Sequence, residues 1–125
     1  MNPDVLAHAT KEYILVTMYH EAMHAYLAYK KAELGNTAFA AQFSAINSNG
    51  GRTLFTAVDD HYEMAANNYL MGLRDVMIGM NPNFDPGRAA SLAKYGIVFL
   101  NKTDSAVNAQ ERNTSLAGYT GTKCP

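Results

Sequence analysis

Residues 11–35 read KEYILVTMYHEAMHAYLAYKKAELG, and this stretch decides the fold. From Lys11 to Leu34 it contains no glycine or proline. Most of its positions are Ala, Leu, Met, Lys, Glu or other residues that are tolerated well in a helix. Gly35-Asn36 then supplies the residues with which helices commonly end. The stretch therefore predicts one long helix over residues 11–34.

The flanking sequence predicts further helices and little or no β-sheet. Asn2-Pro3-Asp4 is typical of a helix start, with Pro3 at the first helical position. Further helices are expected over residues 37–45, 60–80, 88–95 and 105–116, with breaks at 47–51, 81–83 and 85–87. The strand candidates are residues 53–58, which can equally be a simple extended segment, and 97–100, which can equally form a buried turn. The expected fold class is mostly α.

Length and composition indicate one small folded domain. The chain has 125 residues, of which 48% are hydrophobic, so one core is expected and disorder is not. We expect the domain to span residues 1–117, and the glycine-, threonine- and proline-containing residues 118–125 to form a flexible tail. Two possibilities stay open: a whole small protein, or the C-terminal part of a longer one.

Charge and cysteine content narrow the class of partner and the class of site. The net charge of −1 gives no electrostatic argument for nucleic acid or for an anionic membrane surface. No apolar run approaches the roughly 18–20 residues that span a bilayer. The N-terminus shows no secretory signal either. These two observations leave the cellular compartment unassigned. The single cysteine, Cys124, lies too near the end to indicate a cysteine-based zinc site. Any metal must therefore be held by histidines and carboxylates.

The segment His20-Glu21-Ala22-Met23-His24 is an H-E-x-x-H motif inside the long helix. Histidines four residues apart lie on one helix face, roughly 5–6 Å apart at Cβ, so both imidazoles can reach one Zn²⁺. Glu21 lies one step round the helix, beside the metal. There it can accept a proton from a zinc-activated water and pass it to the leaving amine. The motif predicts zinc-dependent hydrolysis, with Glu21 as the general base and acid.

A third zinc ligand has to come from another part of the chain. Leu27 and Lys30 stand where a metzincin would have further motif residues, so that type of site is excluded. The candidates lie in Asp59-Asp60-His61-Tyr62-Glu63. His61 shares a helix face with small residues, whereas Glu63 shares one with polar residues. This favours His61 as the ligand and leaves Glu63 as the alternative. His61 can also be an ordinary residue paired with one of the preceding aspartates.

The chain resembles small zincin peptidase domains, related in pattern to the SprT-like metallopeptidases, in two segments: residues 19–26 (YHEAMHAY) and residues 61–69 (HYEMAANNY). In such domains an H-E-x-x-H-A helix is followed by a second helix that carries H-x-x-M-A. The resemblance covers about residues 10–73, with a weaker similarity at 94–97. It implies a zinc peptidase with His20, His24 and His61 as ligands and Glu21 as catalytic acid/base. One departure is that zincins usually hold their substrate on a sheet edge, and no convincing sheet is predicted here.

Three functions are therefore compatible with the sequence. The first is a zinc metallopeptidase that acts on a peptide or protein substrate. The second is a zinc hydrolase of another amide bond, of the deformylase kind, because the same helical motif serves there. The third is a non-catalytic, zinc-stabilised interaction domain. An open fourth position on the metal would favour the first two, and four protein ligands would favour the third.

Overall fold

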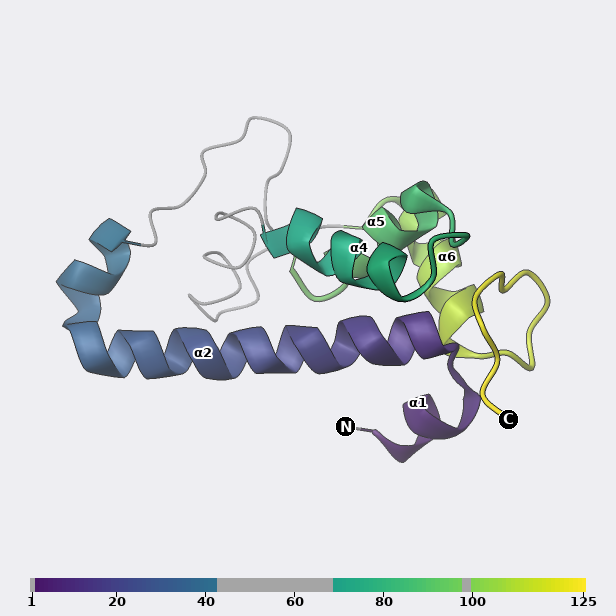
Figure 1. Ribbon diagram of the computed structural model, residues 1–125, viewed down its shortest axis with the longest axis horizontal. Helices are drawn as coiled ribbons and strands as arrows, with labels where there is room; N and C mark the ends of the chain where they lie inside the picture. The colour runs from purple at the N-terminus through teal and green to yellow at the C-terminus, as the bar shows by residue number, and fades with distance from the viewer. Residues whose placement is uncertain (1, 43–68, 98–99) are drawn as a thin grey trace.

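The computed structural model describes residues 2–42, 69–97 and 100–125 (Figure 1). This part of the chain contains five helices: α1 (Pro3–His8), α2 (Lys11–Gln42), α4 (Tyr69–Met80), α5 (Pro86–Lys94) and α6 (Lys102–Arg112). Its β-pairing is limited to one isolated antiparallel bridge between Thr10 and Lys123. The prediction of a mostly α fold with little or no sheet is confirmed.

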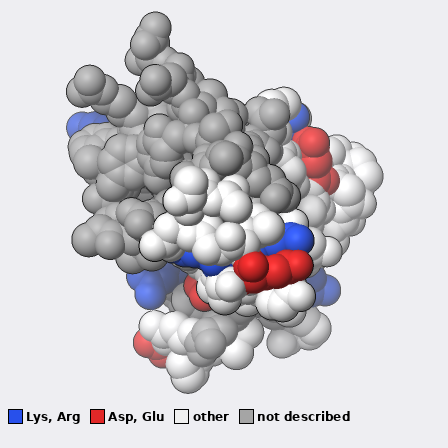
Figure 2. All heavy atoms as spheres, turned by 90° about the vertical axis from the view of Figure 1, so that its left-hand side faces the viewer, with Lys and Arg blue, Asp and Glu red and all other residues white. Residues whose placement is uncertain are grey.

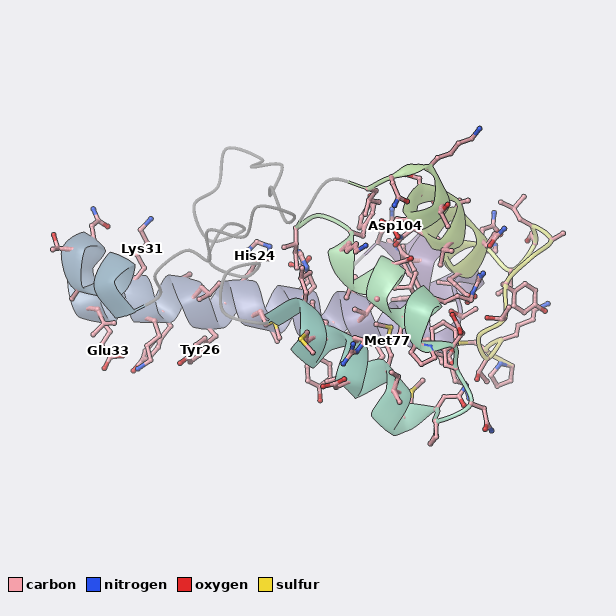
Figure 3. All side chains as sticks on the ribbon, turned by 90° about the horizontal axis from the view of Figure 1, so that it is seen from above. His24, Tyr26, Lys31, Glu33, Met77 and Asp104 are labelled. Carbon is pink, nitrogen blue, oxygen red and sulfur yellow. The ribbon has the colours of Figure 1, made fainter. Side chains whose placement is uncertain are left out.

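The long helix α2 is the element on which the others assemble. Helices α4, α5 and α6 all contact it, and α4 packs on α5, which packs on α6. They lie along the N-terminal half of α2, while the half that carries Tyr26, Lys31 and Glu33 extends beyond them (Figure 3). The core between these helices is made of buried apolar side chains: Tyr13, Val16, Leu73, Met77, Leu92 and Ile97. The packed half of α2 is therefore the half that leads into the H-E-x-x-H motif.

The start of α1 and the break in α2 follow the sequence signals. The side chain of Asn2 accepts a hydrogen bond from the Asp4 amide, and Pro3 occupies the first turn, as expected. In α2, Gly35 has φ 79° and interrupts the helical geometry, after which a second helical segment continues to Gln42. The predicted end of the long helix at Gly35 and the short helix after it are thus confirmed as far as residue 42.

Two of the predicted helices have boundaries that differ from those expected. The helix predicted over 88–95 begins at Pro86, because the Asp85 side chain caps it by accepting the Arg88 amide at 2.9 Å. The helix predicted over 105–116 is α6, which begins earlier because Asn101 caps it, and which ends earlier, at Arg112. Several predicted elements lie outside the described residues, wholly or in part. The loop at 47–51 and the strand candidate at 53–58 do so entirely. The expected helices do so over residues 43–45 and 60–68, and the second strand candidate over residues 98–99.

The segment 118–125, expected to be a loose tail, makes specific contacts with the start of α2 and the end of α6. The Thr122 amide donates to Glu12 Oε2 at 2.7 Å, and the Gly121 amide donates to Glu111 Oε2 at 3.1 Å. Both carboxylates are fully buried. The composition of the tail predicts mobility, but its amide donors satisfy two buried acids that have no access to water.

Surface charges are mixed on the described part of the chain. On the described part of the face in Figure 2, acidic and basic side chains lie next to each other rather than in separate patches. The ion pair between Lys30 Nζ and Glu33 Oε2, at 3.3 Å on α2, is one example. No helix in the described ranges is long and apolar enough to cross a bilayer.

Candidate metal centre

The imidazoles of His20 and His24 converge on one point beside α2. Both side chains are half-buried, and their Nε2 atoms are 3.0 Å apart. The ring centroids are 4.7 Å apart, and the ring planes are inclined at 67° to each other. Four residues of helix bring the two rings to the same side, as the spacing predicts. The rings therefore aim the same nitrogen of each histidine at a shared position.

This donor pair fits a zinc ion. Two nitrogens bound to tetrahedral zinc at about 2.0–2.1 Å lie roughly 3.3 Å apart. The Nε2 separation of 3.0 Å is close to that value. A hydrogen bond from one ring to the other holds the nitrogens at this distance, and an ion between them would replace it. Imidazole nitrogens are also among the ligands that zinc prefers.

The third ligand of the sequence-based site lies outside the described residues. This holds for both His61 and its alternative Glu63. Within residues 2–42, 69–97 and 100–125, no group of three or more His, Cys, Asp or Glu side chains is close enough together to hold a metal ion. The described residues thus contribute two converging imidazoles, and the ligand set of His20, His24 and His61 stays a prediction.

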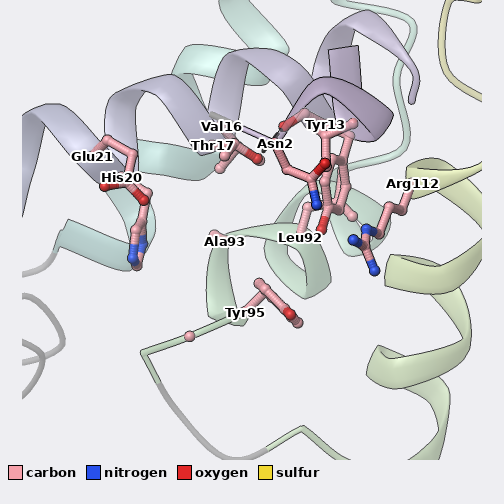
Figure 4. A pocket seen from close by; sticks show the side chains of 12 residues that line it. Asn2, Tyr13, Val16, Thr17, His20, Glu21, Leu92, Ala93, Tyr95 and Arg112 are labelled. Atoms are coloured by element: carbon pink, nitrogen blue, oxygen red, sulfur yellow. Dashed lines mark hydrogen bonds between the residues drawn. The ribbon is translucent and has the colours of Figure 1, made fainter. Parts of the chain in front are cut away.

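Glu21 and His20 stand at one end of a cleft of about 260 Å³ (Figure 4). Glu21 is exposed, so its carboxylate is accessible to water. The cleft then follows α2 back towards its N-terminus, past Thr17, Val16 and Tyr13. At about 1.5 Å per residue, Tyr13 lies roughly 10 Å from His20 along the helix axis. The space is therefore elongated along the helix rather than confined to the histidines.

The opposite wall of the cleft comes from α5 and the turn after it. Leu92 and Ala93 are buried and give this wall its apolar surface. Gly96 has φ 77°, and a Cβ placed on it would lie 3.5 Å from Cε1 and 3.6 Å from Nε2 of His20. A methyl group at this position would therefore be in van der Waals contact with a candidate ligand ring. The neighbouring Tyr95 lines the cleft and is about half exposed.

The far end of the cleft consists of residues that sequence reasoning did not assign to the site. Arg112, the last residue of α6, and Asn2, the cap of α1, meet Tyr13 there. Tyr13 belongs to the buried core, with 5% of its surface exposed, but it also faces the cleft. No local pattern links these residues, because they lie on three different helices. The one local signal among the residues of the cleft is Gly96, because a glycine just after a helix is typical of a tight turn.

Comparisons with protein-family models, with curated proteins and with solved structures found no match to this chain.

Proposed function

We propose that this chain is a zinc-dependent metallopeptidase that hydrolyses peptide bonds, with His20, His24 and His61 as ligands and Glu21 as general base and acid. The observation that supports it most is the convergence of the two Nε2 atoms at 3.0 Å, next to an exposed glutamate that lines an open cleft. Helix spacing alone puts two histidines on one face, but it does not aim the same nitrogen of each at one point.

The chemistry assigned to the chain's own residues is proton transfer and positioning. When bound, zinc would lower the pKa of a water to about 7 and polarise the scissile carbonyl. Glu21 takes one proton from the attacking water as its oxygen bonds to the carbonyl carbon. The same carboxyl then gives that proton to the leaving nitrogen as the C–N bond breaks. Glu21 therefore ends each cycle in the ionised form in which it began.

The shape of the cleft supports a peptide substrate over a small formyl-type amide. A pocket for a formyl group needs to enclose only a few atoms beside the metal. Here the walls continue from His20 to Tyr13, a span of roughly 10 Å or about three residues of extended chain. An extended peptide lying along α2 would fill this length with its scissile bond beside Glu21.

Zinc content is the first test of this proposal. Purified protein should contain about one zinc per chain by elemental analysis, and the ion should be lost in His20→Ala, His24→Ala and His61→Ala. His8→Ala is the matched control, because His8 is an exposed histidine on α1. Full zinc occupancy in His61→Ala would remove that residue from the ligand set.

Turnover is the second test. Glu21→Gln should keep zinc but lose activity on a quenched-fluorescence peptide library by about 10²-fold or more. Glu33→Gln, an exposed glutamate on the same helix, should behave like the wild type. Zinc-loaded wild type that cleaves no peptide, or a Glu21→Gln variant with unchanged turnover, would refute the peptidase proposal.

A further inference from the structure

The end of the cleft that lies away from His20 gathers polar groups between apolar walls. Figure 4 shows Asn2, Tyr13 and Arg112 there, with Tyr95 below them. These side chains come from the cap of α1, from α2, from α6 and from the turn after α5. All can donate hydrogen bonds, and Arg112 carries a full positive charge. Among the lining residues that the structure describes, none at this end carries a carboxylate, and Glu21 at the other end is the only one that does.

Tyr13 is the best-defined member of this group. Its side chain is only 5% exposed, yet its hydroxyl makes no hydrogen bond with any residue of the described ranges. Burial raises the pKa of Tyr13, proximity to Tyr95 raises it further, and the charge of Arg112 opposes the rise. Tyr13, Tyr95 and Arg112 all line this end of the cleft. Tyr13 therefore faces the cleft as a protonated phenol with a donor to offer.

Arg112 brings the charge to this group. Its side chain is exposed, and it forms no ion pair with any carboxylate in the described part of the chain. Asp4 and His8 border its other side, in a separate hollow of the surface. A guanidinium and a phenol donating into the same space are typical of carboxylate recognition. The buried Val16 and Leu92 keep part of that space dry, which strengthens such contacts.

We propose that Tyr13 and Arg112, with Asn2 and Tyr95 beside them, form a subsite that binds a carboxylate of the peptide substrate about three residues from the scissile bond. The inference rests on the proposed function, because the scissile bond is placed at His20 and Glu21. The separation comes from the roughly 10 Å of helix between Tyr13 and His20, divided by about 3.3 Å per extended residue. The carboxylate can belong to an Asp or Glu side chain or to the end of the substrate chain.

Binding measurements on the full chain test the subsite separately from catalysis. The Glu21→Gln protein is titrated with blocked alanine hexapeptides that carry Asp, or Asn of the same shape, at each position in turn. A further pair has either a free C-terminal carboxylate or an amide. We expect Asp, or the free C-terminus, to bind about fivefold more tightly than its neutral partner at one position, which corresponds to a partly exposed ion pair.

Variants locate the preference. Arg112→Gln and Tyr13→Phe should each reduce the Asn-to-Asp ratio of dissociation constants from about five towards one, and Arg112→Lys should retain part of it. Arg74→Gln and Tyr29→Phe are the matched controls, because Arg74 is paired with Asp75 on α4 and Tyr29 is exposed on α2. A retained ratio in both controls supports the subsite. The two Arg112 variants keep the test usable even if Tyr13→Phe weakens the core.

The outcomes separate the subsite from the peptidase proposal. A chain that binds zinc and cleaves peptides, but shows no acidic preference at any position, overturns the subsite alone. A ratio that falls as much in Arg74→Gln as in Arg112→Gln also overturns it, because net charge would then be the cause. A chain without zinc or turnover that keeps an Arg112-dependent preference supports the carboxylate site and refutes the peptidase. A preference confined to the free C-terminus supports the subsite and identifies the chain end as its ligand.

Discussion

Replacing Gly121 with alanine tests the contact between the C-terminal segment and the helical core. A Cβ at this position would lie 2.5 Å from Glu12 Oε2, 2.7 Å from Glu111 Oε2 and 2.9 Å from the Cβ of Thr10. All these distances are below van der Waals contact. The two carboxylates are fully buried, so neither can swing into solvent to make room. The backbone at residue 121 therefore has to move away from both.

The cost follows from the contacts that this movement breaks. Overpacking a tight site costs roughly 1–3 kcal/mol, and a hydrogen bond to a charged group contributes about 1.5–3 kcal/mol. The Gly121 amide makes such a bond to Glu111 at 3.1 Å. Allowing for the entropy that alanine removes from the unfolded chain, we expect the free energy of unfolding to fall by about 3 kcal/mol. For a domain of this size that lowers Tm by roughly 12 °C.

Urea unfolding followed by circular dichroism, together with a thermal scan, measures this change. The matched control is Gly79→Ala on α4, where no described atom lies within 4 Å of the added Cβ. Alanine there should leave stability unchanged or raise it by about 0.5–1 kcal/mol, since glycine disfavours a helix interior. If the two variants were equally stable, the Gly121 backbone would not be held between the carboxylates and the reasoning would fail.

Two further predictions concern the buried acids. Arg88→Met should destabilise the fold by about 3 kcal/mol in urea, because it removes the 2.7 Å ion pair of the fully buried Glu111; a midpoint equal to that of the wild type would contradict this. Stability should also fall in acid. Burial raises the pKa of Glu12, but the hydrogen bonds that its carboxylate accepts from Asn81 and Thr122 have the larger effect and hold the pKa below 4.5. Burial also raises the pKa of Asp104, and the hydrogen bonds from Ser91 and Lys94 hold it below 3.8. A carboxyl whose pKa is lowered in the folded state contributes stability that is complete above its unfolded-state pKa and is lost as pH falls through its folded-state pKa. The free energy of unfolding should therefore be level above about pH 5.5 and decline below it. A free energy that stays constant down to pH 3 would refute this prediction.

Features with a local cause could be predicted from the sequence. Asn2 and Pro3 begin a helix because a side-chain acceptor and a fixed φ suit its first turn, and Gly35 interrupts one because it adopts a positive φ. The spacing of His20 and His24 belongs to the same class, since four residues of helix suffice to bring the rings together. In each case the cause lies within a few residues of its effect.

Features that depend on distant residues could not be predicted in this way. Glu12 and Thr122 are 110 positions apart, and nothing in either local sequence indicates that they meet. The tail is therefore expected to be mobile from its composition, although its amides have buried partners. The cleft is similar, because Tyr13, Tyr95 and Arg112 become neighbours only when α2, α5 and α6 pack. The third ligand stays a prediction, because His61 lies outside the described residues.

The tail contacts and the cleft are linked through the chain itself. Glu12 precedes Tyr13 on α2, and Glu111 precedes Arg112 on α6. The tail contacts both glutamates through the amides of Gly121 and Thr122. One residue further along each helix the side chain points about 100° away, and there Tyr13 and Arg112 line the cleft. A shift of residue 121 away from both glutamates removes contacts through which the tail connects α2 and α6, so it should also loosen the placement of the phenol relative to the guanidinium. Gly121→Ala should thus lower the Asn-to-Asp ratio of dissociation constants under conditions where the variant is still folded. An unchanged ratio would show that the packing of α2 against α5 and α6 positions the subsite without the tail.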